Sequence, residues 1–99
     1  MNSSANKRSV IFTYPAIFTY EKGREISVLF PDLNVATSGV DNADALTAAR
    51  ECLETALKRL KEDGVLFPAQ TRFEDMHAFI AENERIYDIN AVVDWSSKG

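Results

Sequence analysis

The stretch ADALTAARECLETALKRLKE, residues 43–62, decides the fold of this chain. Its apolar residues recur at spacings of three and four, which places them on one stripe of an α-helix. The stripe consists of Leu46, Ala49, Leu53, Ala56, Leu57 and Leu60. The opposite face is charged, and Glu54 and Lys58 stand at a favourable i,i+4 spacing. The sequence therefore predicts one long amphipathic helix that packs against a second layer.

Polar residues mark both ends of this helix. Asn42 is the expected N-cap, because its side chain can accept hydrogen bonds from the first free amides. Asp44 suits the positive end of the helix dipole, and Gly64 is placed for the left-handed residue that ends a helix.

Alternating patterns before the helix predict three strands, at residues 11–20, 25–30 and 33–40. The links between them are short, and the first contains Gly23, so the strands should form an antiparallel meander. Pro15 cannot donate a ladder hydrogen bond, and the first strand is therefore expected to lie at a sheet edge or to be bulged there.

Beyond the helix, residues 65–71 contain Pro68 and are expected to form a loop. A short helix is expected over residues 73–82, and a last strand over residues 86–95. The resulting order, β-β-β-α-(α)-β, predicts an α+β fold in which the last strand joins the meander and the long helix packs on one face. The other face would stay open, and self-association would cover it if it is apolar.

The 99 residues suit a single domain, expected over residues 10–95, with a flexible N-terminus at 1–9 and a polar tail at 96–99. Lys7 and Arg8 precede an apolar run, as in a signal peptide. That run is β-branched and aromatic, and no small-residue cleavage site follows it. A cytoplasmic location is the resulting expectation.

The formal net charge of −4 argues against a large nucleic-acid footprint and favours a basic partner. A single cysteine, Cys52, excludes an intramolecular disulfide. One cysteine and one histidine also make a structural zinc site unexpected in the monomer, and no cofactor is expected.

Several short motifs follow one another in a recognisable order. They are Tyr14-Pro15-Ala16-Ile17-Phe18, Phe30-Pro31-Asp32-Leu33, the residues Gly39, Asp41 and Asn42 before the helix, Glu62-Asp63-Gly64 at its end, and Pro68. In this order and spacing, residues 10–71 resemble the N-terminal domain of HicB-family antitoxins. The resemblance implies a partial RNase H-like fold. It also implies a small, basic, messenger-RNA-cleaving HicA toxin as partner, and association into dimers or tetramers.

The chain departs from the family pattern in two places. Asn34-Val35-Ala36 stands where the family has a Pro-Gly-Cys type of turn, so contacts of that loop should differ. After Thr71 only residues 72–99 remain, without a basic cluster, which is too little for the DNA-binding module of many members. The chain therefore resembles a short form, and direct DNA binding is not expected.

Four residues are candidates for partner contact. Asp32 and Asn34 are candidates by position, in the loop beyond the second strand. Tyr87 and Trp95, on the last strand, belong either to the core or to an association surface, where aromatic residues are favoured.

The sequence also offers weaker chemical readings. His77 lies near Glu74, Asp75 and Glu82, which suggests either a metal or acid–base site or a surface histidine. Asp32, Asp41 and Asp44 suggest either the two-metal carboxylates of a nuclease or residues that shape a turn and a helix start. The structural interpretation is preferred in each case, and Cys52 is expected to be a buried, inert thiol.

The aromatic residues of the first two strands also allow two interpretations, a stacking platform for single-stranded nucleic acid or packing in the core or at a partner interface. They are Tyr14, Phe18, Tyr20 and Phe30. Stacking proteins add a basic groove, which these strands do not offer, so packing is preferred.

Three functions are consistent with the sequence. The first is a binding protein that neutralises a HicA-type toxin without catalysis of its own. The second is a HicB-like homo-oligomeric interaction or regulatory module that has no toxin. The third, a minimal metal-dependent nuclease, is the least favoured because no catalytic constellation stands out in the sequence.

Overall fold

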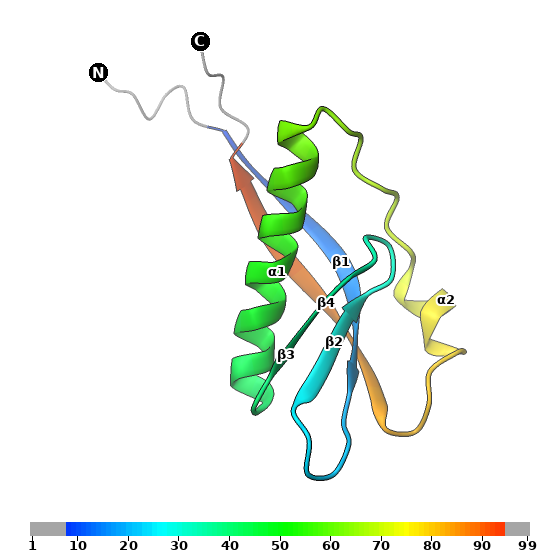
Figure 1. Cartoon of the computed structure of the whole chain (residues 1–99). Helices are drawn as coiled ribbons and strands as arrows, with labels where there is room; N and C mark the ends of the chain where they lie inside the picture. The colour runs from blue at the N-terminus through cyan, green and yellow to red at the C-terminus, as the bar shows by residue number, and fades with distance from the viewer. Residues whose placement is uncertain (1–7, 95–99) are drawn as a thin grey trace.

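The computed structural model describes residues 8–94 and consists of a four-stranded sheet wrapped around one long helix (Figure 1). The strands are β1 (Ser9–Thr19), β2 (Ile26–Phe30), β3 (Val35–Gly39) and β4 (Glu84–Asp94). They lie in the order β3-β2-β1-β4, and every neighbouring pair is antiparallel. The predicted α+β fold, the meander and the returning C-terminal strand are confirmed.

The long helix α1 spans Asn42–Glu62 and buries Ala45, Ala49, Leu53 and Leu57 against the sheet. These side chains repeat every fourth residue and form one line along the helix. Leu46, which the sequence pattern placed on the buried stripe, is 42% exposed. In the first half of the helix, Ala45 and Ala49 face the sheet in place of Leu46, because their small side chains let the helix approach the sheet closely.

The N-cap of α1 is Asp41, one residue before the predicted Asn42. Asp41 has an extended backbone, and its carboxylate accepts a hydrogen bond from the Asp44 amide at 2.8 Å. The Asn42 side chain accepts the Tyr20 hydroxyl at 2.8 Å instead. Asn42 therefore ties the start of the helix to the end of β1.

The prediction that Pro15 would place β1 at an edge or in a bulge is wrong. β1 lies between β2 and β4, and its register with β4 is unbroken from Ser9–Asp94 to Thr19–Glu84. The Tyr20 amide donates to the Asn83 carbonyl at 2.8 Å, so even-numbered residues direct their main-chain groups toward β4. The main-chain groups of the odd-numbered Pro15 therefore point toward β2, which pairs with β1 only at residues 17–19. Its missing N–H costs no ladder bond.

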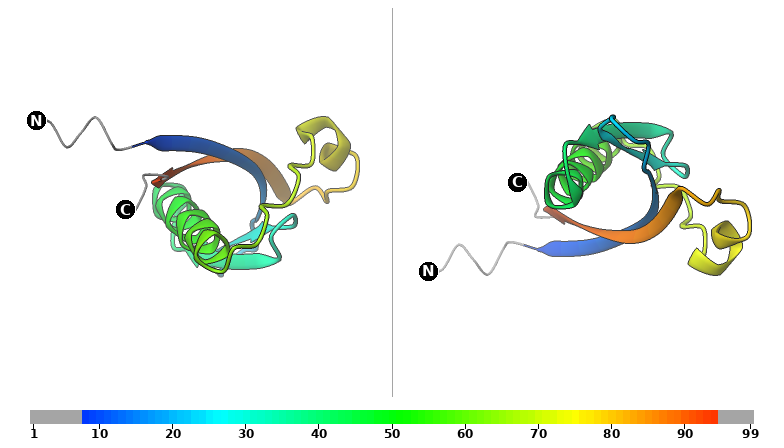
Figure 2. Two further views of the ribbon diagram at one scale, coloured as in Figure 1. Left: turned by 90° about the horizontal axis from the view of Figure 1, so that it is seen from above. Right: turned by 90° about the horizontal axis from the view of Figure 1, so that it is seen from below.

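The second helix, α2, spans only Phe73–His77, although the periodicity predicted a helix to residue 82. The chain turns at once, because the Phe79 amide donates to the Met76 carbonyl at 3.0 Å and the Glu84 amide to the Ala81 carbonyl at 3.1 Å. Figure 2 shows α2 on the opposite face of the sheet from α1.

Because of α2, the second face of the sheet is not fully open as predicted. Met76 of α2 is buried, and so are Pro15 of β1 and Ile86 of β4, whose alternation places them on this outer face. The larger core lies on the α1 face, where Tyr14, Phe18, Val28 and Phe30 are fully buried with Leu53 and Leu57. Among residues 8–94, no helix is long and apolar enough to cross a membrane.

Candidate partner-binding surfaces

The turn between β2 and β3 carries Asp32 and Asn34, two of the residues that the sequence suggests for partner contact. The Phe30 carbonyl accepts hydrogen bonds from the amides of Leu33 (3.2 Å) and Asn34 (2.8 Å). Asn34 has φ 56°, a left-handed conformation that asparagine tolerates better than most residues. Asn34 is exposed, so it is accessible to a partner.

Asp32, in the same turn, is engaged within the molecule. Its carboxylate accepts the Thr71 amide at 2.8 Å and the Thr71 hydroxyl at 2.5 Å. Nearby, the Tyr14 hydroxyl donates to the Pro68 carbonyl at 2.6 Å. Burial, and then the charge of Asp32, raise the pKa of Tyr14. Both side chains therefore fasten the segment after α1 to the sheet.

Tyr87 shares its surroundings between the core and the surface. Its ring meets Phe18 edge to face, with the ring centroids 4.9 Å apart, yet it remains 40% exposed. Burial, and then a side-chain hydrogen bond with Tyr87, raise the pKa of Tyr20. Tyr87 is therefore accessible to a partner, while contacts with Phe18 and Tyr20 hold its ring in place. Trp95 lies outside the described residues.

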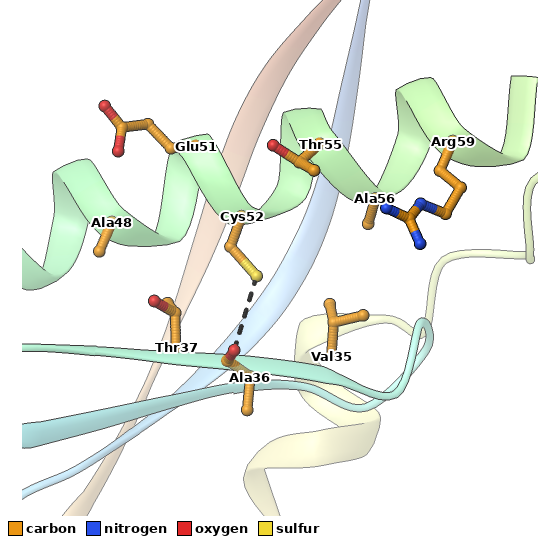
Figure 3. Close-up of a pocket in the computed structure, with 9 residues that line it drawn as sticks. All are labelled: Val35, Ala36, Thr37, Ala48, Glu51, Cys52, Thr55, Ala56 and Arg59. Atoms are coloured by element: carbon orange, nitrogen blue, oxygen red, sulfur yellow. Dashed lines mark hydrogen bonds between the residues drawn. The ribbon is translucent and has the colours of Figure 1, made fainter. Parts of the chain in front are cut away.

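A groove between β3 and α1 was not foreseen from the sequence (Figure 3). It has a volume of about 460 Å³ and runs along Ala48, Cys52 and Ala56 of the helix, opposite Val35–Thr37. The Cys52 thiol points at the Ala36 carbonyl, 3.9 Å away, and burial raises its pKa. Small residues at i, i+4 and i+8 beside the buried stripe were the signal for this hollow.

The three aspartates considered as nuclease carboxylates occupy two different places. Asp32 follows β2 at Phe30, whereas Asp41 and Asp44 follow Gly39, which pairs with the other end of β2 at Ile26. Asp44 accepts the Val40 amide at 2.9 Å and so serves the helix start. His77 is exposed and lies against the ring of Phe73. Within residues 8–94, no three or more acidic, histidine or cysteine side chains gather as metal ligands.

Neither a family model nor a curated protein matches this chain. A solved structure does match it, a chain of the "Toxin-Antitoxin complex from Streptococcus pneumoniae", at 25% sequence identity and a TM-score of 0.68. This chain is similar to a chain of a toxin–antitoxin complex. The match covers 83% of this chain and 69% of that chain, so it extends over the sheet and helix rather than over one motif.

Proposed function

We propose that this chain is an antitoxin-like protein that binds and neutralises a small, basic, messenger-RNA-cleaving toxin of the HicA type. The observation that carries the proposal is the similarity to a chain of a toxin–antitoxin complex over 83% of the sequence. The ordered motifs of residues 10–71, which resemble HicB-family antitoxins, support the same function and supply the type of toxin.

The proposed action is binding rather than catalysis. The acidic balance of the chain would attract a basic toxin and increase the rate of encounter. Asn34 and Tyr87 are the proposed contact residues that lie accessible on the surface. Asp32 would act indirectly, because it fixes the turn that presents Asn34. The cytoplasm, where messenger RNA is translated, is the proposed location.

The test is to express the protein encoded by the neighbouring gene in a bacterium, with and without this chain. We expect that protein to be small and basic, to arrest growth alone, and to co-purify with this chain when growth is restored. An unrelated acidic protein of similar size serves as the control. A toxin that still arrests growth in the presence of folded, abundant chain would refute the proposal.

A second candidate function, a homo-oligomeric module without a toxin, is favoured by one feature of the outer face. Ile11 and Val92 are partners in the β1–β4 register and are 64% and 53% exposed. Self-association would remove this apolar pair from water. A stable oligomer in solution, with no basic protein encoded nearby, would favour this function over neutralisation.

A further inference from the structure

The net negative charge of the chain is concentrated in residues 72–94, which contain α2 and β4. Of the 15 acidic and 11 basic residues, six and two lie in residues 72–94, so nine of each sign lie elsewhere. The net charge of −4 therefore belongs to this segment alone. Its acidic residues are Glu74, Asp75, Glu82, Glu84, Asp88 and Asp94, and its basic residues are Arg72 and Arg85.

Within this segment, β4 is an edge strand with β1 on one side. The Val92 amide donates to the Glu54 carboxylate at 3.3 Å, and the Asp94 carbonyl accepts from the Lys61 ammonium group. Even-numbered residues of β4 therefore direct their main-chain groups away from β1, because direction alternates along a strand. These two bonds from α1 close the C-terminal end of the edge.

The N-terminal end of the edge is closed as well. The Glu84 amide donates to the Ala81 carbonyl at 3.1 Å, and the Glu84 carbonyl accepts from the Arg85 guanidinium at 3.0 Å. Between the two closed ends lie Ile86, Asp88 and Asn90, whose amides and carbonyls also point outward. In this stretch β4 lies away from α1, because only the C-terminal end of β4 approaches the helix (Figures 1 and 2).

We propose that this open stretch of β4 accepts an extended strand of a basic protein, which joins the sheet beside β4. Main-chain hydrogen bonds to residues 86, 88 and 90 would supply the pairing, as in other cases of strand addition. On the outer face the incoming strand would meet Asp88, and on the α1 face Tyr87 and Ile89. The matching strand therefore alternates Lys or Arg with apolar residues.

A second copy of this chain fits the edge less well. It would bring another segment with the same net charge of −4. The register that uses all three outward residues of both copies pairs Asp88 with Asp88, and like charges directly opposite are destabilising. The inference rests on the proposed function only in that the toxin would be the protein that supplies the strand.

The test uses a peptide with alternating Lys and Val or Ile residues as the probe, and its Glu-substituted version as the control. The Asp88→Pro variant removes one outward amide and places a ring on the edge. The β1–β4 ladder should survive, because that amide points away from β1. Asp88→Ala is the matched variant that keeps the amide and removes the charge. Amide spectra show which variants are folded and where the peptide binds.

For the wild type we expect peptide-induced shifts centred on residues 86–90, and no binding of the acidic peptide. Affinity should fall at least about tenfold in Asp88→Pro, and about two- to fivefold in Asp88→Ala. Shifts centred on β3, or undiminished binding by folded Asp88→Pro, would overturn the inference. So would a homodimer with amides 86, 88 and 90 already protected. If Asp88→Pro neutralised the toxin as well as the wild type does, the proposed function would stand, but the inference that the toxin binds through the edge of β4 would be overturned.

Discussion

Gly39 stands where the end of β3 meets the start of α1. A Cβ atom at this position would lie 2.4 Å from the Ala45 nitrogen and 2.5 Å from the Ala45 Cα. Both are main-chain atoms of Ala45, whose side chain is fully buried, so neither can move aside easily. The lack of a side chain at residue 39 is therefore what lets α1 begin against the sheet.

We expect Gly39→Ala to destabilise the protein by about 2–3 kcal/mol, as overpacking does. Urea unfolding followed by circular dichroism measures the change. The control is Gly23→Ala, where φ is +77° and nothing lies within 4 Å, so only the cost of the left-handed backbone, about 1–2 kcal/mol, is expected. Equal loss in the two variants would show that close approach at Gly39 is unimportant.

Tyr14 lies at the centre of β1 and holds the Pro68 carbonyl. Because burial and the Asp32 charge raise the pKa of this phenol, its stabilising effect is complete below its unfolded pKa of about 10. The effect is lost as the pH rises through the higher folded value. Ionised Tyr14 would repel Asp32 and could no longer donate to Pro68.

The Tyr14→Phe variant should therefore cost about 1 kcal/mol at pH 8, because the Pro68 carbonyl loses its donor. Above pH 10 the free energy of unfolding of the wild type should fall more steeply than that of the variant. The difference between the two free energies should therefore narrow. Urea titrations between pH 8 and pH 11 measure this. Tyr20 titrates in both proteins and cancels from the comparison. A difference that is constant over this range would contradict the assignment.

At the scale of elements, side-chain periodicity predicted which faces are buried but not which strands are neighbours. Alternation in residues 11–20 predicted a strand, and in β1 the even-numbered Tyr14, Ala16 and Phe18 are all buried. The pattern of β1 could not show that pairing with β2 stops before it reaches Pro15, because the extent of that pairing depends on the length of β2. For α2, spacing of apolar residues could not reveal the turn at Met76–Phe79, which stops the helix after five residues.

The C-terminal end of the β4 edge is protected by α1 rather than by another strand. The Glu54 carboxylate of α1 accepts a hydrogen bond from the Val92 amide at 3.3 Å. Such side-chain bonds occupy main-chain groups that would otherwise invite pairing with another chain.

We expect Glu54→Ala to accelerate hydrogen exchange at the Val92 amide about two- to tenfold, because one exposed hydrogen bond is removed. Amide exchange measured by nuclear magnetic resonance gives the rates. Glu51→Ala changes the same helix on its groove side and should leave Val92 unchanged. If both variants accelerate Val92 equally, the effect is a general loosening of α1 and not the opening of the edge.

At the scale of the whole molecule, the candidate surfaces were predictable only in part. The chain order of the motifs suggested Asp32, but its partner Thr71 is 39 residues away and could not be found from local patterns. The excess of carboxylates in residues 72–94 is visible in the sequence. Only the structure shows that α2 contacts β4 and that β4 is an edge strand, so that these carboxylates lie beside an exposed edge of the sheet. Contact between distant segments is what local patterns lack.

The position of the charge, and not only its total, should govern association with a basic partner. The double variant Asp75→Asn with Glu82→Gln removes two exposed carboxylates from the acidic segment. Glu51→Gln with Glu62→Gln removes two exposed carboxylates from α1, so both proteins have the same net charge. Electrostatic steering depends on charges that lie within a Debye length of the docking surface, about 10 Å at 0.1 M salt.

We therefore expect the first double variant to associate about three- to tenfold more slowly with the basic protein encoded by the neighbouring gene, at low salt, and the second to associate at nearly the wild-type rate. Stopped-flow measurements over a range of salt concentrations would give both rates and their convergence at high salt. Equal slowing of the two variants would mean that the partner responds to total charge. In that case the acidic segment would have no special part in the encounter.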